Sequence, residues 1–306
     1  MGKISKFMIV LLALLALGYY WLLVNAGPAN APARTIDIAA IRRAADALPG
    51  EKPTAVTFAP MALRHIPGAA LAAGTGLRQV TSGVITWRLE TAGGGIVIDP
   101  GLSEADAHSM GFKFYDRRAR ALVDRWMDQA NMILFTHAHV DHVGGFLDHP
   151  RFESIVGKAV VSEGMVGNIN GLWRENARLL DQPRKLGPIE AVAPGVVLIQ
   201  APGHTPASEM IYVRLASGRE YLFAGDTVSL SVNAEIPTPR SRLVADWLAP
   251  EDRPAVIGWL KGLKALKEKN PDLVIVPSHD ADWLAANGDA NGIAMAKELR
   301  QLAETK

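Results

Sequence analysis

The chain has 306 residues, of which 49% are hydrophobic and none is cysteine. This length suffices for one large hydrophobic core, and the lack of cysteine excludes disulfides and thiolate metal ligands. The formal net charge of +1 gives no sign of the basic surface that nucleic-acid binding requires, so no nucleic-acid partner is expected.

Residues 1–26 are expected to form a membrane anchor or a signal peptide. Lys3 and Lys6 precede residues 7–24, which are uncharged and almost wholly apolar. This stretch is longer than the roughly 7–15 residues of a secretory apolar region and close to the roughly 17–25 of a membrane span. Small residues at 29–33 keep a cleaved signal peptide open as the alternative. Both interpretations place the rest of the chain in the periplasm or elsewhere outside the cytoplasm, and the first anchors it to the inner membrane.

Residues 27–75 are expected to form a linker and a lead-in segment. Residues 27–34 are rich in proline and alanine and read as a short, stiff linker. Apolar positions between residues 36 and 48 have helical spacing, and Pro49-Gly50 would end that helix. A strand is predicted over residues 54–58.

From residue 76 to residue 306, strands and helices are predicted in alternation, as expected for one domain. Residues 84–89 and 95–99 predict a hairpin across a glycine-containing turn. Helices are predicted over residues 115–130, 251–269 and 291–303, and the second of these would carry Glu251 and Asp252 in its first turn. Helices interleaved with paired strands indicate sheets packed on each other and covered outside by helices.

The densest group of ligand-type residues lies at 137–142, which read His-Ala-His-Val-Asp-His. The apolar residues 132–135 precede it and predict a buried strand. Such a strand would deliver His137 and His139 to one side of the chain, because alternate strand residues share a face. Imidazole nitrogen and carboxylate oxygen are ligands that Zn²⁺ and related ions accept, so this group predicts a metal site.

Further ligand-type residues follow later strands. We expect Asp141 and His142 to lie at a turn, where Gly144 and Gly145 let the chain change direction. Three later apolar runs each end in a turn with one ligand-type residue, namely His204 after 196–199, Asp226 after 221–224 and His279 after 273–276. Strands that deliver ligands from their carboxyl ends would place all of them along one rim of a sheet.

In order and spacing, this set resembles the metallo-β-lactamase superfamily over residues 77–285. The resemblance implies an α/β (α+β) fold, a four-layer αββα sandwich, with two Zn²⁺ ions, or other divalent metals such as iron or manganese. It assigns His137, His139 and His204 to one metal, Asp141, His142 and His279 to the second, and Asp226 to both. Asp99, in Ile98-Asp99-Pro100-Gly101, resembles the structural aspartate of the family's early motif.

The resemblance also implies an activity. The expected enzyme is an exported hydrolase that cleaves an ester or lactone of a small-molecule substrate, using a hydroxide that bridges the two metals. Asp141 and Asp226 are the candidate catalytic residues, and Asp226 would orient the water as well as bind metal. Met165, Trp173 and Trp247 suggest an apolar cleft lined by residues 165–173 and 227–247. The sequence defines neither the substrate-binding residues nor the oligomeric state.

Other members of the superfamily are less compatible with these residues. The β-lactamases proper place cysteine or serine where this chain has Asp226, and the few residues after His279 leave no room for the glutathione-binding extension of glyoxalase II. A phosphodiesterase or sulfatase, a one-iron persulfide dioxygenase and a non-enzymatic, membrane-tethered binding module stay open as alternatives. Binding modules of this superfamily usually lose ligands, whereas this chain keeps all seven.

Overall fold

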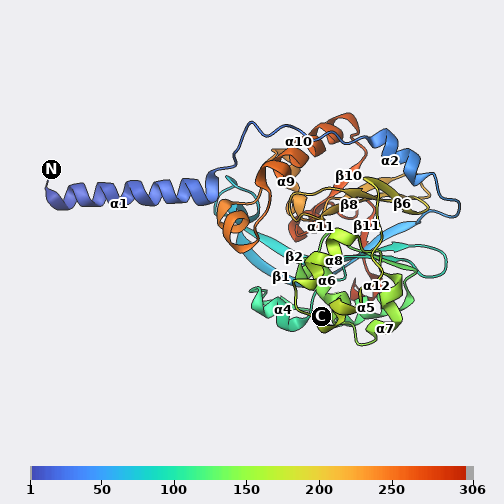
Figure 1. Cartoon of the computed structure of the whole chain (residues 1–306). Coiled ribbons are helices and arrows are strands. Elements are labelled where there is room, and N and C mark those ends of the chain that lie inside the picture. The colour runs from blue at the N-terminus through green and yellow to red at the C-terminus, as the bar shows by residue number, and fades with distance from the viewer. Residues whose placement is uncertain (1, 301–306) are drawn as a thin grey trace.

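Two β-sheets form the centre of the computed structural model, which describes residues 2–300 (Figure 1). The first sheet contains β1 (Ala55–Pro67), β2 (Gln79–Glu90), β3 (Ile96–Ile98), β4 (Phe114–Tyr115), β5 (Met132–Leu134) and β11 (Ile293–Met295). The second contains β6 (Ile189–Ala193), β7 (Val196–Gln200), β8 (Glu209–Arg214), β9 (Glu220–Phe223) and β10 (Val274–Val276). Their strand orders are β11-β1-β2-β3-β5, with β4 paired to β1, and β10-β9-β8-β7-β6.

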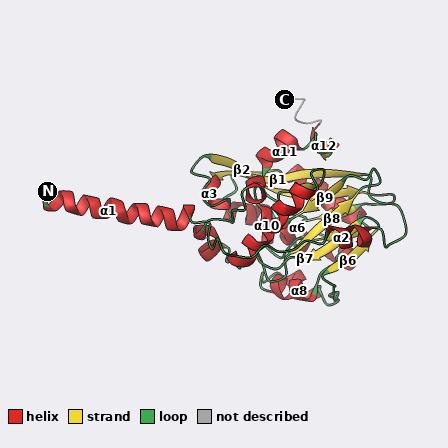
Figure 2. Ribbon diagram, turned by 90° about the horizontal axis from the view of Figure 1, so that it is seen from above, coloured by secondary structure: helices red, strands yellow, loops and turns green. Residues whose placement is uncertain are grey.

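Helices cover the outer faces of both sheets (Figure 2). The α-helices of this body are α2 (Ile38–Ala45), α3 (Gly68–Leu71), α4 (Glu104–Ser109), α5 (Arg117–Gln129), α6 (Val140–Leu147), α7 (Phe152–Ile155), α8 (Glu163–Asn170), α9 (Ser231–Glu235), α10 (Arg253–Lys269), α11 (Ala281–Asn287) and α12 (Lys297–Arg300). Short 3₁₀ turns are η2 (Val156–Lys158), η3 (Glu175–Leu179) and η4 (Gly225–Val228), and η5 (Leu243–Leu248) is a π-helical turn.

Alternation along the strands divides the core into layers. On β7, Val196 and Leu198 pack between the two sheets, whereas Val197 and Ile199 pack against α2 and α10. The outer face of the first sheet packs against α5 to α8. Because successive strand residues point to opposite faces, each sheet is buried on both sides. The predicted αββα sandwich is therefore confirmed.

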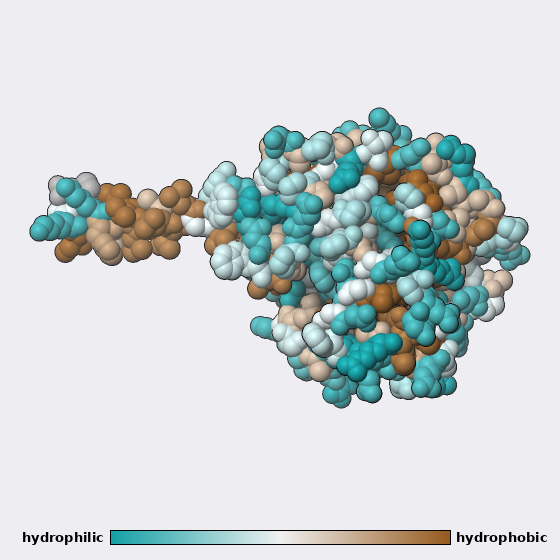
Figure 3. Space-filling view, viewed as in Figure 1, coloured by the Kyte–Doolittle hydropathy of each residue, from teal (hydrophilic) through white to brown (hydrophobic). Residues whose placement is uncertain are grey.

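The N-terminal helix projects away from this body. It consists of α1 (Lys3–Tyr19) and the π-helical turn η1 (Tyr20–Val24), which follows it directly. The combined helix Lys3–Val24 has a mean hydropathy of 2.4 in its most apolar window, and none of that window is buried. Figures 1 and 2 both show it extending alone from one end of the molecule, and Figure 3 shows its hydrophobic surface, with hydrophilic residues near the N-terminal tip. It is long and apolar enough to cross a membrane.

Residues 27–75 are integrated into the sandwich. β1 pairs with β2 along its whole length, and α2 packs on the second sheet. The linker before α2 lies along α10, where Arg34 N donates to Gly258 O at 2.9 Å and Lys261 Nζ donates to Ala29 O at 2.7 Å. A Cβ at Gly262 would overlap the Arg34 carbonyl oxygen, so glycine permits this close approach.

Two helix predictions need correction. Residues 293–295 form β11, which pairs in parallel with β1, and α12 begins only at Lys297, so the predicted helix over 291–303 is wrong at its start. Its predicted end lies outside the described residues. In α10, Asp252 is the N-cap and accepts a hydrogen bond from Ala255 N at 3.0 Å, while Glu251 lies before the helix and turns toward the site described next. Short apolar runs next to polar turns do not distinguish a strand from a helix.

Candidate metal centre

All seven candidate ligands meet at one end of the sandwich. Residues 137–142 follow β5 of the first sheet, whereas His204, Asp226 and His279 follow β7, β9 and β10 of the second. The prediction of one sheet rim is therefore wrong in detail, because both sheets contribute. Potential ligand atoms gather in two groups, each with all its atoms within 4.8 Å of one another, namely His137, His139, His204 and Asp226, and Asp141, His142 and His279.

Three imidazoles of the first group are in contact. Nδ1 of His139 lies 3.1 Å from Nε2 of His137 and 3.0 Å from Nε2 of His204. His137 and His204 are buried, while His139 is half-buried and faces a cleft. These nitrogens converge on one point, as the ligands of a single ion do.

The Asp226 carboxylate lies between the two groups. Its Oδ2 is 3.7 Å from His137 Nε2 and 3.5 Å from His204 Nε2. Its Oδ1 is 2.9 Å from His279 Nε2 and 3.4 Å from His142 Nε2. Each oxygen thus faces one group, an arrangement that allows one carboxylate to be shared by two ions.

Several of the remaining ring nitrogens bond to the protein, which fixes the orientation of those imidazoles. His204 Nδ1 bonds to Glu251 Oε2 at 3.2 Å, and His279 Nδ1 bonds to the Gly83 carbonyl at 2.8 Å. Outer partners of this kind are typical of metal-binding histidines. Nε2 of His142 is buried without a hydrogen-bond partner. An orphaned nitrogen that faces two carboxylates fits a bound cation, so the residues fit a dinuclear centre.

Asp99 links Thr136, which lies just before the run at 137–142, to His142 within that run. Its Oδ1 accepts from Thr136 N at 2.8 Å, and its Oδ2 accepts from Thr136 Oγ1 at 2.7 Å and contacts His142 Nδ1 at 2.9 Å. Asp99 is buried and has φ 50°, a backbone conformation that is uncommon for residues other than glycine. The aspartate singled out in the sequence thus orients a candidate ligand without belonging to either group.

The helix α6 places Asp141 and His142 in its first turn, and His139 is its N-cap. The predicted turn at Gly144 and Gly145 is wrong, because both glycines lie inside this helix. Gly145 N donates to Gly101 O at 2.7 Å, and a Cβ at Gly145 would overlap the Pro100 carbonyl oxygen. These glycines therefore permit close packing of the helix on the Asp99 loop and do not form a turn.

Electrostatics keep most ligands in the protonation state that metals require. Burial lowers the pKa of His137 and His204 well below the usual range, so both imidazoles are neutral. Burial alone would raise the pKa of Asp226, but Arg240 and the nearby histidines hold it well below its usual range. For His142, burial acts to lower the pKa, but the carboxylates of Asp99, Asp226 and Asp141 raise it well above. A metal cation would take the place of that proton.

Two charged residues of the site were not identified from the sequence. The buried Arg240 donates to Asp226 Oδ2 and to Ser229 Oγ, the latter at 2.9 Å. Glu251 lies against His204, and burial raises its pKa to about 7. Neither residue has a motif around it, because each reaches the site from a loop that is remote in sequence from its partner. The sequence predicted Glu251 only as a residue in the first turn of a helix over 251–269.

A cleft of about 670 Å³ opens over the two groups. His139, Asp141, Asp226 and His279 supply part of its polar lining, and Ile66 of β1, Ala70 and Leu71 of α3, and Val244 and Leu248 of η5 supply apolar lining. Of the predicted apolar lining, Met165 is instead buried in the core, and Trp173 and Trp247 are exposed and outside the cleft lining. Leu172 and Val244 from the same segments do line it, as does Leu248, which lies just beyond the second segment.

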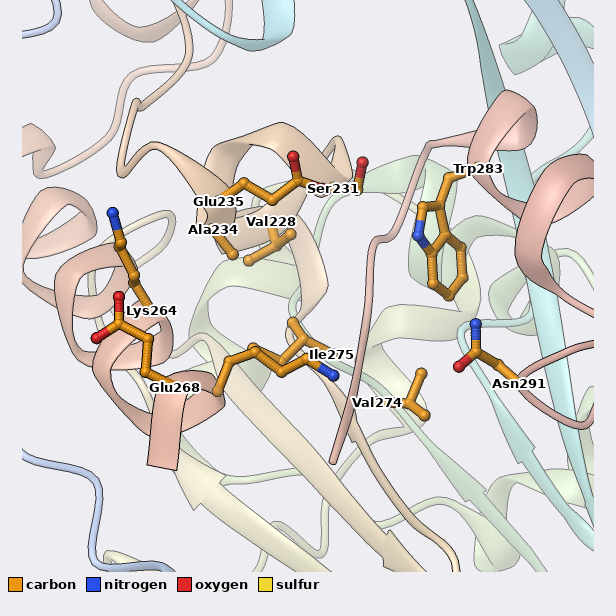
Figure 4. Close-up of a pocket in the computed structure, with 11 residues that line it drawn as sticks. Val228, Ser231, Ala234, Glu235, Lys264, Glu268, Val274, Ile275, Trp283 and Asn291 are labelled. Atoms are coloured by element: carbon orange, nitrogen blue, oxygen red, sulfur yellow. The ribbon is translucent and has the colours of Figure 1, made fainter. Parts of the chain in front are cut away.

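A second cavity, of about 410 Å³, lies beside the edge strand β10 (Figure 4). Figure 4 shows Trp283 and Asn291 on one side of this cavity, and Lys264 and Glu268 of α10 on the other. Its lining contains no histidine and none of the seven candidate ligands. It is therefore separate from the metal centre.

Fold and site define the class of protein. An αββα sandwich with histidines and aspartates at the ends of its strands is the framework of a metal-dependent hydrolase. Residues 75–279 match the family model described as the metallo-beta-lactamase superfamily. The chain belongs to this superfamily, which confirms the prediction from sequence.

Solved structures agree on the fold. A quorum-quenching N-acyl homoserine lactone lactonase is 20% identical with a TM-score of 0.59, over 76% of this chain and 94% of that one. An N-acyl homoserine lactone hydrolase with N-hexanoyl-L-homoserine bound at its catalytic metal centre is 20% identical with a TM-score of 0.58, over 77% and 96%. A probable metal-dependent hydrolase from Staphylococcus aureus is 14% identical with a TM-score of 0.55, over 76% and 91%. No curated protein sequence matched the chain.

Proposed function

We propose that this protein is a membrane-anchored, extracytoplasmic hydrolase that binds two Zn²⁺ ions and cleaves an ester or lactone. The observation that carries this proposal is the position of Asp226, whose two carboxylate oxygens face two separate groups of ligand-type side chains. The lactones named for the two similar structures support the substrate class. The apolar helix Lys3–Val24, behind two lysines, supports the location.

We assign His137, His139 and His204 to one ion and Asp141, His142 and His279 to the other, with Asp226 shared. Bound there, two such ions would supply a hydroxide nucleophile near neutral pH and a Lewis acid for the carbonyl of an ester or lactone. Asp226 and Asp141 face the cleft, where their carboxylates can orient a water molecule.

Arg240 has a second role in this proposal. Its hydrogen bonds to Asp226 and Ser229 hold the guanidinium at the cleft wall. A guanidinium has five N–H donors, so others are available to an oxygen of the substrate as charge develops on it. Arg240 thus orients Asp226 and stabilises negative charge in the same cleft.

Metal analysis and substrate profiling of the full chain test this function. We expect close to two divalent ions per folded protein, and turnover of esters or lactones that a chelator abolishes and Zn²⁺ restores. One iron with oxygen consumption would indicate the dioxygenase alternative. Preference for phosphodiesters or sulfate esters would show that the substrate is not a carboxylic ester or lactone. Folded protein that binds no metal would contradict the proposal that the protein is a metal-dependent hydrolase.

The location has its own test. Protease added to intact cells with a permeabilised outer layer should digest the catalytic domain, because Lys3 and Lys6 hold the N-terminus on the cytoplasmic side. Protection from the protease would place the domain in the cytoplasm and contradict the proposed orientation.

A further inference from the structure

The N-terminal helix ends against the elements that build the cleft. Gly74 N, just after α3, donates to Leu23 O at 2.9 Å, and the Arg242 guanidinium at the start of η5 lies 4.3 Å from the ring centroid of Trp21. Arg253 donates to Asn25 O at 2.6 Å and to Gly27 O at 2.8 Å. The end of the helix is therefore held in a defined position on the catalytic body.

The same two elements form one wall of the cleft. Ala70 and Leu71 of α3 and Val244 and Leu248 of η5 line the same cleft as four of the candidate ligands. Ser241 N donates to Ala70 O at 3.1 Å and joins these two elements. The cleft thus opens next to the point at which the N-terminal helix leaves the body.

Large apolar side chains are exposed around that point. Trp247 and Leu248 are each 74% exposed, and Leu77 and Leu243 are also exposed. We name these four residues the exit patch. Tyr19, Tyr20 and Trp21 are exposed at the end of the helix, where aromatic residues of a membrane span meet the bilayer surface. Leu243 follows Arg242, which contacts Trp21, so the exit patch adjoins this aromatic belt.

We propose that the exit patch inserts into the bilayer surface and that the cleft receives its substrate from the membrane. This inference rests on the proposed function, because it takes the helix as an anchor and the metal centre as an esterase or lactonase. A bilayer is the occupant that fits, since the exit patch continues the apolar and aromatic surface of a helix that spans it. There, the exposed tryptophan and leucine side chains would move from water to the bilayer surface without burying a charged group.

The chemistry of the substrate follows from Leu248. This side chain belongs both to the exit patch and to the cleft lining, so an apolar path joins the bilayer surface to the metal centre. An acyl chain can follow that path without crossing water, while its ester or lactone group reaches the polar wall. We therefore assign as substrate class amphipathic esters or lactones whose acyl chains partition into the bilayer.

Site-specific labelling tests the membrane contact without any activity measurement. The chain has no cysteine, so Leu248→Cys, Leu77→Cys and the control Leu48→Cys each carry one fluorophore. Leu48 is 38% exposed and follows α2, which Figures 1 and 2 show at the end of the body opposite α1. In liposomes with nitroxide-labelled lipid, full-length protein should show strong quenching at positions 248 and 77 and little at 48. Equal quenching at all three positions would overturn the membrane contact.

Turnover tests the substrate class. With metal-loaded, full-length protein in liposomes, kcat/KM should be higher for long-chain than for short-chain acyl esters or lactones of one headgroup. Trp247→Ser should reduce that ratio about fivefold, the loss expected from about 1 kcal/mol of apolar membrane contact. A ratio that does not depend on chain length would overturn the substrate class. Absence of all ester and lactone turnover would refute the proposed function instead, and the quenching result would still decide the membrane contact.

Discussion

The two walls of the cleft are built in different ways. The metal wall is built on the seven candidate ligands, which come after strands β5, β7, β9 and β10, and four of the seven lie within positions 137–142. The apolar wall consists of apolar residues of α3 and η5, which belong to no recognisable motif. The end of the N-terminal helix packs beside these two elements. The chemistry of the metal wall is therefore visible in the sequence, whereas the role of the apolar wall depends on where a distant helix packs.

Asp226→Asn should produce the largest loss of activity. A neutral amide is a poor bridge between two cations, so we expect turnover to fall on the order of 10²-fold or more while the fold is retained. Turnover, metal content and melting temperature measure this together. His65→Ala is the matched control, because the exposed His65 on β1 is not among the residues that line the cleft and contacts Thr81 at 3.4 Å. Near-normal turnover of the asparagine variant with two metals bound would show that Asp226 is not the bridge.

Glu251→Gln tests whether a residue that contacts a candidate ligand, without being one, contributes to metal affinity. Glu251 Oε2 holds His204 Nδ1 at 3.2 Å, and the substitution removes the charge that orients this imidazole. We expect metal affinity to fall about 10-fold or more, as measured by competition with a chelator of known affinity. Glu175→Gln, at an exposed glutamate, should leave the affinity unchanged. Equal metal affinities for both variants would show that Glu251 does not contribute to metal binding.

Gly145→Ala tests the backbone contact that positions the metal wall. The new Cβ would overlap the Pro100 carbonyl oxygen, so α6 and the Asp99 loop must move apart. We expect the free energy of unfolding to fall by about 1–3 kcal/mol in chemical denaturation. Gly157→Ala, where a Cβ has nothing within 4 Å, should cost far less. If the two variants are equally stable, close packing of α6 does not set the position of this turn.

Prediction from sequence succeeded where a residue type has few alternative uses. The run at 137–142 and its three partners do gather into two groups of ligand-type side chains, as the sequence predicted, while metal binding by them stays a prediction. Asp99 was identified through a resemblance, and its three hydrogen bonds supply the physical reason for it. Arg240 was not identified, because its partner Asp226 lies in another loop and no local pattern connects them.

The fold shows the same division. Alternating apolar residues and turns predicted the layered sandwich and the hairpin of β2 and β3, which pair with Trp87 opposite Ile98. β11 was not predicted, since three apolar residues form a strand only because β1 provides a partner edge. The sequence likewise did not predict a role for the exposed residues of η5, because that role depends on their lying beside Trp21 of the N-terminal helix.

Glu209 is a buried carboxyl that belongs to neither wall of the cleft, so it shows the effect of burial on a pKa. Burial raises its pKa to about 7, although a hydrogen bond with Ser162 acts to lower it. The folded state therefore binds more protons than the unfolded state between the usual glutamate pKa and about 7. Over that window the free energy of unfolding must fall as the pH rises, and it stays lower above it.

Glu209→Gln replaces this carboxyl with a neutral group and removes its pH dependence. We expect the variant to match the parent protein near pH 4–5 and to be more stable at pH 8, by at most about 3 kcal/mol. Chemical denaturation of both proteins across this pH range, with the same metal present, measures the difference. Glu153→Gln, at an exposed position, should show no such divergence. Because loss of metal acts on both proteins alike, a difference that grows as the pH rises reports Glu209 alone, and parallel curves would show that its carboxyl is already ionised in the folded state.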